Sequence, residues 1–174
     1  MGTSLDLSVV AQKRSAAEAA EEVVLAEIER LCSILSTYQS DSAVSLLVAN
    51  ARWSAVPEEL WALLTSYATW EVRSGGAISA TIPDLGSTGR FELNGERNLA
   101  RVADGAINLD ALGKAFIADR AATLSMAEVP GIDRLLLNLG GDIAIRSRNA
   151  THYSSWSIGV ADPNASADNA PPLS

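Results

Sequence analysis

The chain has 174 residues and a formal net charge of −8, with 48% hydrophobic and 20% charged residues. This length and composition are those of one globular domain with a buried core. Because no basic patch offsets the negative charge, the sequence argues against nucleic acid and anionic membrane surfaces as main partners. An anionic ligand would need local positive charge from backbone amides or a bound cation.

The sequence contains one cysteine, Cys32, and one histidine, His152. An intrachain disulfide is therefore impossible, and a Cys- or His-based zinc site or a Ser-His-Asp triad lacks the necessary residues. No run approaches the roughly 18 apolar residues of a membrane span, so none is predicted. The N-terminus, "MGTSLDLSVV", lacks the basic start and apolar centre of a signal peptide, although a removed export signal would leave no trace.

The first half of the chain predicts one strand and two helices. Polar and apolar residues alternate in "SLDLSVV", which is typical of a half-buried strand. From Ser15 a long helix follows, with apolar residues at helical spacing up to Leu35, and it ends near "LSTYQSDS". A second helix begins at Pro57, a residue suited to a first turn, and ends at the glycine pair 75–76.

The second half predicts a hairpin, a third helix and further strands. In "RVADGAINLD", Asp104-Gly105 is a favoured two-residue hairpin turn. A helix covers about Leu112 to Ala127, "RLLLNLGGDIAIRS" forms two strands around a Gly-Gly interruption, and "WSIGVADP" forms one more. Since these elements lack regular βαβ alternation, the predicted class is α+β, with a mixed sheet and packed helices.

The C-terminal residues differ in composition from the rest. Residues 163–174, "PNASADNAPPLS", are low in apolar content, and we expect a loop or truncated linker there. Residues 1–162 form the predicted domain. Because the tail directly follows a predicted strand, we expect this domain to be incomplete.

Gly113-Lys114 stands at the start of the third predicted helix. A P-loop needs a glycine five residues before the Gly of its Gly-Lys and a Ser or Thr after the Lys, but positions 108 and 115 are Asn and Ala. A phosphate site remains possible, because helix N-terminal amides and a lysine attract anions. The alternative is that Lys114 is a solvated helix charge and Gly113 only permits close packing.

Three further patterns leave alternatives open. The Gly-Gly of "LNLGGD" is typical of a tight turn and less often of ligand contact. Asp142, which follows it, could bind a metal, cap a turn or accept a backbone amide. Tyr38 could stack on an aromatic ring or close the core, and the glycine pair of "RSGGAIS" could face a ligand or only end a helix.

Six stretches, in this order, resemble the FAD:protein FMN transferase family, also called the ApbE family: "MGT", "LSTYQSDSAVS", "SGGAIS", "NLDALGKAFIADRA", "LNLGGDI" and "WSIGVADP". The family pattern reads approximately D-L-G-G-I-A-K-G-Y-A-V-D for the fourth stretch and N-L-G-G-D-I for the fifth. Lys114, Asp119 and residues 138–143 coincide with it, and Phe116 replaces Tyr. The resemblance covers essentially the whole chain.

The resemblance implies an activity and its partners. Family members bind FAD with a divalent metal, usually Mg²⁺, and transfer FMN to a Ser or Thr hydroxyl of an acceptor protein, with release of AMP. Some members mainly hydrolyse FAD to FMN and AMP. Many relatives act at the cell envelope or in the periplasm, and the absence of an export signal here leaves the cytoplasm open.

The resemblance also implies site residues. Ala111 matches a position whose backbone carbonyl ligates the metal, and no catalytic residue is implied. The implied FAD-binding residues are Met1, Tyr38, Gly76, Ala77, Ile78, Asn108 and Lys114.

Several positions depart from the family pattern. Asn108 replaces an Asp that contacts FAD, Ile78 replaces Phe, and Asp110-Ala111 replace two glycines. The later Ser-His-Ile-Ile-Asp-Pro-like segment and Asp…Asp-Thr metal cluster have no match. We therefore expect a fragment or one part of a split protein, which alone binds FAD weakly and transfers nothing. The alternatives are a non-catalytic flavin-binding module, an FAD pyrophosphatase and a plain structural domain.

Overall fold

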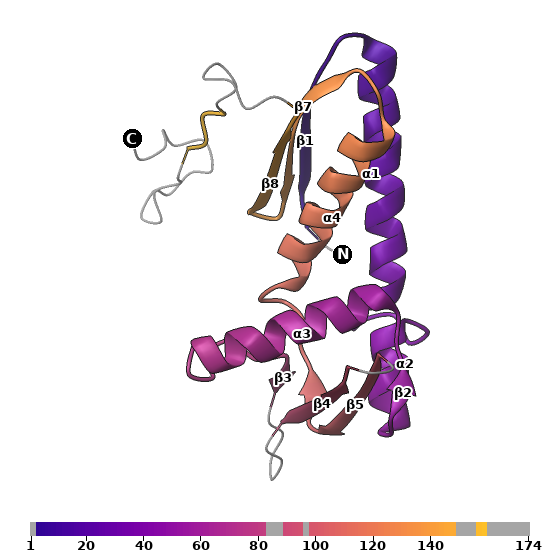
Figure 1. The fold of residues 1–174 in the computed structure, drawn as a ribbon, viewed down its shortest axis with the longest axis vertical. Helices are drawn as coiled ribbons and strands as arrows, with labels where there is room; N and C mark the ends of the chain where they lie inside the picture. The colour runs from indigo at the N-terminus through magenta and orange to yellow at the C-terminus, as the bar shows by residue number, and fades with distance from the viewer. Residues whose placement is uncertain (1–2, 83–88, 96–97, 149–155, 160–174) are drawn as a thin grey trace.

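The computed structural model describes residues 3–82, 89–95, 98–148 and 156–159 and confirms the α+β class (Figure 1). The helices are α1 (Arg14–Leu35), α2 (Ala43–Asn50), α3 (Glu58–Arg73) and α4 (Gly113–Glu128). The strands are β1 (Leu5–Ala11), β2 (Ser54–Ala55), β3 (Thr81–Ile82), β4 (Arg90–Asn94), β5 (Leu99–Asp104), β6 (Ala106–Ile107), β7 (Ile132–Leu139) and β8 (Asp142–Ser147). No helix in these ranges is long and apolar enough to cross a membrane.

The strands form three small sheets, with the orders β1-β7-β8, β2-β5-β4 and β3-β6. Every pairing among the described strands is antiparallel. The class is as predicted, but these sheets take the place of the expected mixed sheet. Parallel neighbours within one sheet need a crossover, whereas α4 connects β6 in one sheet to β7 in another.

Helices α1 and α4 pack together on the β1-β7-β8 sheet, and α3 lies across the short strands in the other half (Figure 1). Alternation in β7 explains this packing, because Leu135, Leu137 and Leu139 are buried while the residues between them are partly exposed. One hydrophobic core joins the two halves. Its buried members include Leu31, Leu60, Leu64, Tyr67, Ile117 and Leu137.

Of the four helices in the described ranges, the sequence predicts three and does not predict α2. The predicted helices correspond to α1, α3 and α4, with ends close to those expected. Before α2, the Ser- and Asp-rich stretch indicates only a helix end. In the structure it also begins a helix, because the Ser42 hydroxyl accepts the backbone amide of Ser45 at 3.1 Å and so caps α2.

The predicted hairpin at Asp104-Gly105 is wrong. Strand β5 pairs with β2 and β4, whereas β6 pairs with β3, so the two expected arms lie in different sheets. Gly105, with a φ of 80°, turns the chain from one sheet to the next. The strand predicted at "WSIGVADP" is not formed by residues 156–159, and its remaining residues and the tail at 163–174 lie outside the described ranges.

The Gly-Gly of "LNLGGD" forms the tight turn between β7 and β8, as one of the two interpretations predicts. Gly140 and Gly141 have φ values of 62° and 97°, and Leu139 pairs with Asp142 across the turn. The backbone amide of Gly140 also donates to the carbonyl of Ser4 at 3.0 Å. The chain before β1 therefore holds the turn in place.

Gly140→Ala is expected to lower the free energy of unfolding by about 2 kcal/mol. The positive φ is strained for alanine, and the added Cβ would overlap Thr3 Oγ1 and lie 3.2 Å from Thr3 Cβ. Urea unfolding followed by circular dichroism measures the loss. In a Thr3→Gly background the loss should fall to about 1 kcal/mol, since only the backbone strain remains. Equal losses in both backgrounds would refute the steric contribution.

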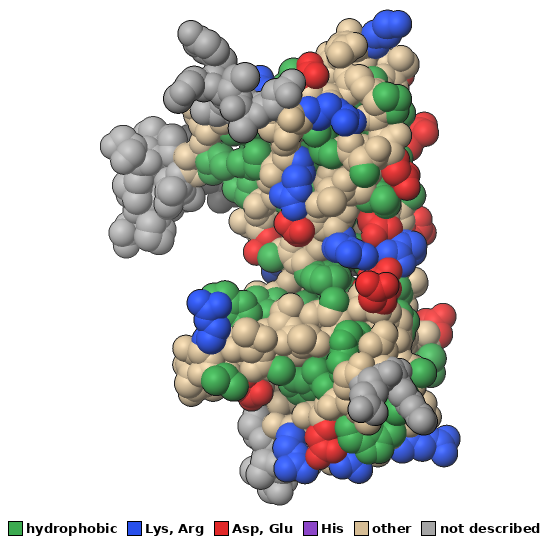
Figure 2. Space-filling view, in the orientation of Figure 1, with side chains coloured by type: hydrophobic (Ala, Val, Ile, Leu, Met, Phe, Trp, Pro, Cys, Tyr) green, Lys and Arg blue, Asp and Glu red, His purple; other side chains and the backbone are tan. Residues whose placement is uncertain are grey.

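Charge on the face shown in Figure 2 is mixed. Basic and acidic side chains are interspersed there, and no continuous basic stripe is seen. This face therefore lacks the electrostatic footprint of a nucleic-acid-binding surface.

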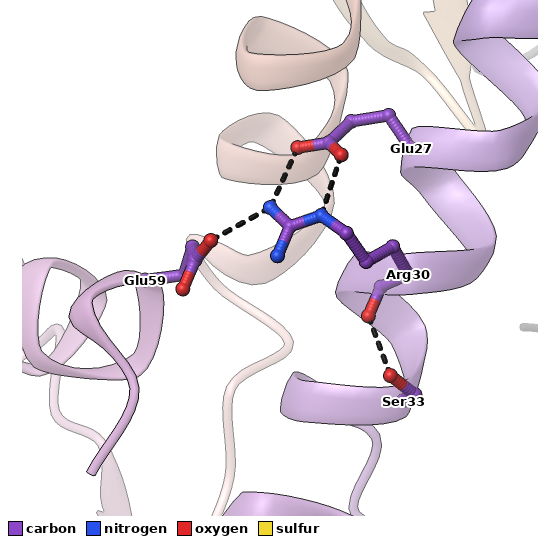
Figure 3. Close-up of polar contacts among 4 residues, drawn as sticks. All are labelled: Glu27, Arg30, Ser33 and Glu59. Carbon is purple, nitrogen blue, oxygen red and sulfur yellow. Dashed lines mark hydrogen bonds and ion pairs between the residues drawn. The ribbon is translucent and has the colours of Figure 1, made fainter.

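Arg30 joins α1 to α3 (Figure 3). Its guanidinium donates to both carboxylate oxygens of Glu27, at 2.7 and 2.9 Å, and to Glu59 at 2.7 Å. The carboxylates are largely buried, with Glu27 7% and Glu59 14% exposed. Because α1 packs on the β1-β7-β8 sheet and α3 lies in the other half, this cluster ties the two halves together.

Candidate functional site

The loop Asn108–Leu112 leads into α4, whose first turn lies beside α3 where the two halves meet (Figure 1). Asn108 Oδ1 accepts the backbone amide of Asp110 at 2.7 Å, and the Tyr67 hydroxyl accepts that of Leu112 at 3.0 Å. Leu112 gives α4 no side-chain cap, and the first turn of this described helix has no acidic residue. Within its first turn, α4 therefore has no acidic side chain of its own to offset the positive end of the helix dipole, which favours an anion.

Lys114 is the second residue of α4, and its side chain is 37% exposed. A lysine is unfavourable at this end of a helix, so its position favours a ligand of negative charge. Its Nζ lies 4.0 Å from the carboxylate of Asp142 at the start of β8. The structure thus brings the Gly-Lys and Gly-Gly-Asp stretches together and makes Asp142 the neighbour of Lys114.

Tyr38 lies in the loop between α1 and α2 and is 89% exposed. The alternative that it closes the core is therefore wrong. Buried Ser42 donates its hydroxyl to the carbonyl of Ser36 at 2.6 Å, and the Ser36 hydroxyl accepts the amide of Tyr38 at 3.2 Å. These hydrogen bonds anchor the backbone of the loop, and the exposed ring is available for stacking on an aromatic ligand.

Tyr38 and Lys114 line the same pocket, between the C-terminal end of α1 and the first turn of α4. Among the described residues that line it, Asp110 and Lys114 are the charged ones. Burial raises the pKa of the Cys32 thiol, which keeps it protonated and a poor nucleophile. The pocket therefore does not favour thiol chemistry, and its exposed aromatic ring and its lysine are the groups that an anionic aromatic ligand could contact. Its lining residues are Cys32, Leu35, Ser36, Thr37, Tyr38, Leu109, Asp110, Gly113, Lys114 and Ile117.

The segment Gly76-Ala77-Ile78 follows α3 and is not part of that pocket lining. Gly76 is exposed with a φ of 89°, and the amide of Ile78 donates to Ser74 Oγ at 2.9 Å. Two residues later, the carbonyl of Ala80 accepts the amide of Asn108 at 2.8 Å. The β3-β6 pairing thus joins this segment to the loop before α4.

Ala111 is exposed in the turn before α4, and Met1 lies outside the described residues. The part of the chain that the structure describes contains no group of three or more His, Cys, Asp or Glu side chains that could hold a metal ion. Mg²⁺ at nucleotide sites takes most of its ligands from phosphates and water. Ala111 is an exposed residue and follows Asp110, so its backbone carbonyl could serve as one of the few protein ligands of such a metal.

The sequence does not identify Tyr67 and Ser42 as residues that support the site. Tyr67 binds the loop before α4, and Ser42 anchors the loop that carries Tyr38. Tyr67 has the helical spacing of Leu60 and Leu64, and this pattern indicates a core residue. Ser42 is a typical helix-capping residue, and this local signal could have identified it as the N-cap of α2. Their hydrogen-bond partners lie on other elements or across a loop, so no local pattern predicts them.

The fold is similar to that of several solved structures. The ApbE protein of Thermotoga maritima gives a TM-score of 0.78 at 20% identity, covering 94% of this chain and 62% of that protein. A mutant of the flavin transferase ApbE of Vibrio cholerae gives 0.76 at 18% identity, with the same coverages of 94% and 62%. The apo flavinyl transferase ApbE of Pseudomonas stutzeri gives 0.70 at 15% identity, covering 91% and 62%.

These likenesses establish the class of fold, which is that of the ApbE flavin transferases. The sequence profile of the ApbE family matches residues 1–101 and 87–173, so the chain belongs to the ApbE family. No curated protein sequence matches the chain. The chain spans 62% of the length of the structural relatives named above.

Proposed function

We propose that this protein acts in the Mg²⁺-dependent transfer of FMN from FAD to a Ser or Thr hydroxyl of an acceptor protein, with release of AMP. The observation that carries the proposal is the meeting of Tyr38 and Lys114 in one pocket at the first turn of α4, in a chain of the ApbE family. An aromatic ring, a cation and helix amides suit a flavin dinucleotide and its pyrophosphate. Two of the structural relatives are flavin transferases, which supports the same reaction.

In this proposal the described residues bind and orient FAD. The Tyr38 ring stacks on an aromatic ring of the dinucleotide, while Lys114 in the first turn of α4 holds the pyrophosphate. Asn108 Oδ1 already accepts the amide of Asp110, so its side-chain NH₂ is the group that remains for FAD. The exposed backbone of residues 76–78 borders the ligand.

The transfer forms a P–O bond to the acceptor hydroxyl, whose proton is released to solvent, and breaks the P–O–P linkage of FAD with AMP as the leaving group. Negative charge therefore accumulates on the phosphoryl oxygens and on AMP. Bound Mg²⁺ would supply Lewis-acid stabilisation of this charge, with the Ala111 carbonyl among its ligands. Lys114 neutralises part of the same charge.

A non-catalytic flavin-binding module is the second candidate. Asn108 stands where a carboxylate is expected in the family, which removes one acidic group from the loop before α4. The residues that the structure describes also include no acidic cluster for a metal. Such a module would bind FAD in the same pocket and release no AMP.

Two measurements test the proposal. FAD is titrated into the purified chain with and without Mg²⁺, and quenching of flavin fluorescence is expected to saturate and to depend on Mg²⁺. The chain is then incubated with FAD, Mg²⁺ and a Ser- or Thr-containing acceptor peptide, and mass spectrometry is used to look for covalent FMN on the peptide. Covalent FMN would show that the residues present suffice for the transfer, and it would contradict the expectation that this chain alone transfers nothing. Quenching without covalent FMN is the result expected both of an incomplete transferase and of the binding module. Quenching that does not depend on Mg²⁺ would favour the binding module, and no quenching would overturn both candidates.

A further inference from the structure

Tyr67 connects the middle of α3 to the loop before α4. It is fully buried, and its hydroxyl accepts the backbone amide of Leu112 at 3.0 Å. Burial raises the pKa of this hydroxyl, while hydrogen bonds from the Leu112 and Ala111 amides oppose the rise. The group is therefore a neutral phenol at neutral pH. Tyr67 does not line the pocket of Tyr38 and Lys114, so any effect on FAD must pass through the loop.

The amide that Tyr67 binds belongs to the same peptide unit as the carbonyl of Ala111. The described chain has no cis peptide bond, and in a trans peptide the N–H and C=O point in opposite directions. With its N–H directed at the buried phenol, this peptide directs the Ala111 oxygen away from the core. A hydrogen bond to the N–H also polarises the peptide and makes its oxygen a better donor to a cation.

The start of the loop is fixed by a separate set of contacts. The amide of Asn108 donates to Ala80, and its side-chain oxygen accepts the amide of Asp110. Beyond the loop, the amide of Gly113 donates to Leu109 at 2.7 Å. Between these anchors, the Ala111–Leu112 peptide is held by the Tyr67 hydroxyl. Removing that oxygen takes away this contact and the one from the Ala111 amide, so the peptides on either side of Ala111 can rotate while the contacts at Asn108 and Gly113 stay in place.

We propose that Tyr67 is a positioning residue that orients the Ala111 carbonyl as a ligand for the divalent metal bound with FAD. The inference rests on the proposed function, in which Ala111 contributes this carbonyl to Mg²⁺. Residues that orient a metal ligand commonly change metal affinity by about 10- to 100-fold when they are removed. A purely structural hydrogen bond would change stability alone, by about 1 kcal/mol.

The test is Tyr67→Phe, which removes the hydroxyl and keeps the ring in the core. FAD binding is measured by fluorescence quenching across a Mg²⁺ titration, and thermal unfolding is measured without ligands. We expect the Mg²⁺ concentration for half-maximal enhancement of FAD binding to rise about tenfold. FAD affinity in the absence of metal should stay within twofold of the wild type, because Tyr38 and Lys114 are unaffected.

Ser125→Ala is the matched control. Ser125 is also fully buried, and its hydroxyl donates to the carbonyl of Ala20 at 3.2 Å, between α4 and α1. Ser125→Ala should lose about as much thermal stability as Tyr67→Phe, and its FAD binding should respond to Mg²⁺ as the wild type does. A wild-type Mg²⁺ response in Tyr67→Phe, or an equal shift in Ser125→Ala, would overturn the positioning role. A wild-type chain whose FAD binding ignores Mg²⁺ would overturn the proposed function itself, and this inference with it.

Discussion

Lys114→Met is expected to weaken FAD binding about 10- to 100-fold, which corresponds to the loss of a charged hydrogen bond of about 1.5–3 kcal/mol. Lys114 is the one cation among the described residues that line the pocket. Methionine keeps an unbranched apolar chain of high helix propensity, so α4 and the pocket wall remain. Fluorescence titration with FAD at low ionic strength measures the effect, because salt screens the interaction of a half-exposed lysine.

Two further variants make this result specific to Lys114. Lys114→Arg retains the charge but changes the donor geometry, so it should recover part of the lost affinity. Lys13→Met removes the only other lysine of the sequence, which is exposed just before α1, at the end of that helix opposite the pocket. It changes the net charge by the same amount and should leave FAD binding unchanged. Equal weakening in both methionine variants would assign the effect to net charge and refute the pyrophosphate contact.

The parts of the fold that the sequence predicts are those with strong local patterns. Helix α1 has a sustained apolar face, and β1 and β7 alternate as the sheet requires. The pairing of short strands is different, because β6 has two residues and no pattern of its own. A favoured turn such as Asp104-Gly105 predicts local pairing, but β5 gains more partners by joining β2 and β4. Tertiary pairing therefore overrides the local turn preference.

For the site, the sequence proposes residues such as Tyr38 and Lys114 but does not specify how they are brought together. Tyr38 and Lys114 share a pocket because α1 and α4 pack side by side, so that the end of one helix faces the start of the other. The contact between Lys114 and Asp142 likewise depends on α4 lying on β8. These distances follow from packing between distant segments, which motif order does not specify. The hydrogen bond between Tyr67 and Leu112 cannot be predicted from the sequence for the same reason.

Arg30→Met is expected to lower the free energy of unfolding by about 2 kcal/mol at neutral pH. Removing one partner of a buried ion pair costs about 3–5 kcal/mol, and the 46% exposure of Arg30 reduces that figure. The variant leaves Glu27 and Glu59 as neighbouring, largely buried carboxylates without their cation. Because the cluster joins α1 to α3, the two halves should separate more easily. Urea unfolding monitored by tryptophan fluorescence measures the loss.

The pH dependence and an exposed control distinguish this cluster from an ordinary surface pair. Burial raises the pKa of Glu59, but its own backbone amide and Arg30 outweigh this and hold that pKa below the ordinary 4.5. A lowered pKa in the folded state gives stability that is present above pH 4.5 and is lost as the pH falls below it. The deficit of Arg30→Met should therefore be largest at neutral pH and shrink in acid. Arg14→Met, which breaks an exposed pair with Glu18, should cost less than about 0.5 kcal/mol at either pH. If the two variants lose the same small amount, Arg30 does not hold the halves together, and the orientation of α3 depends on the shared apolar core.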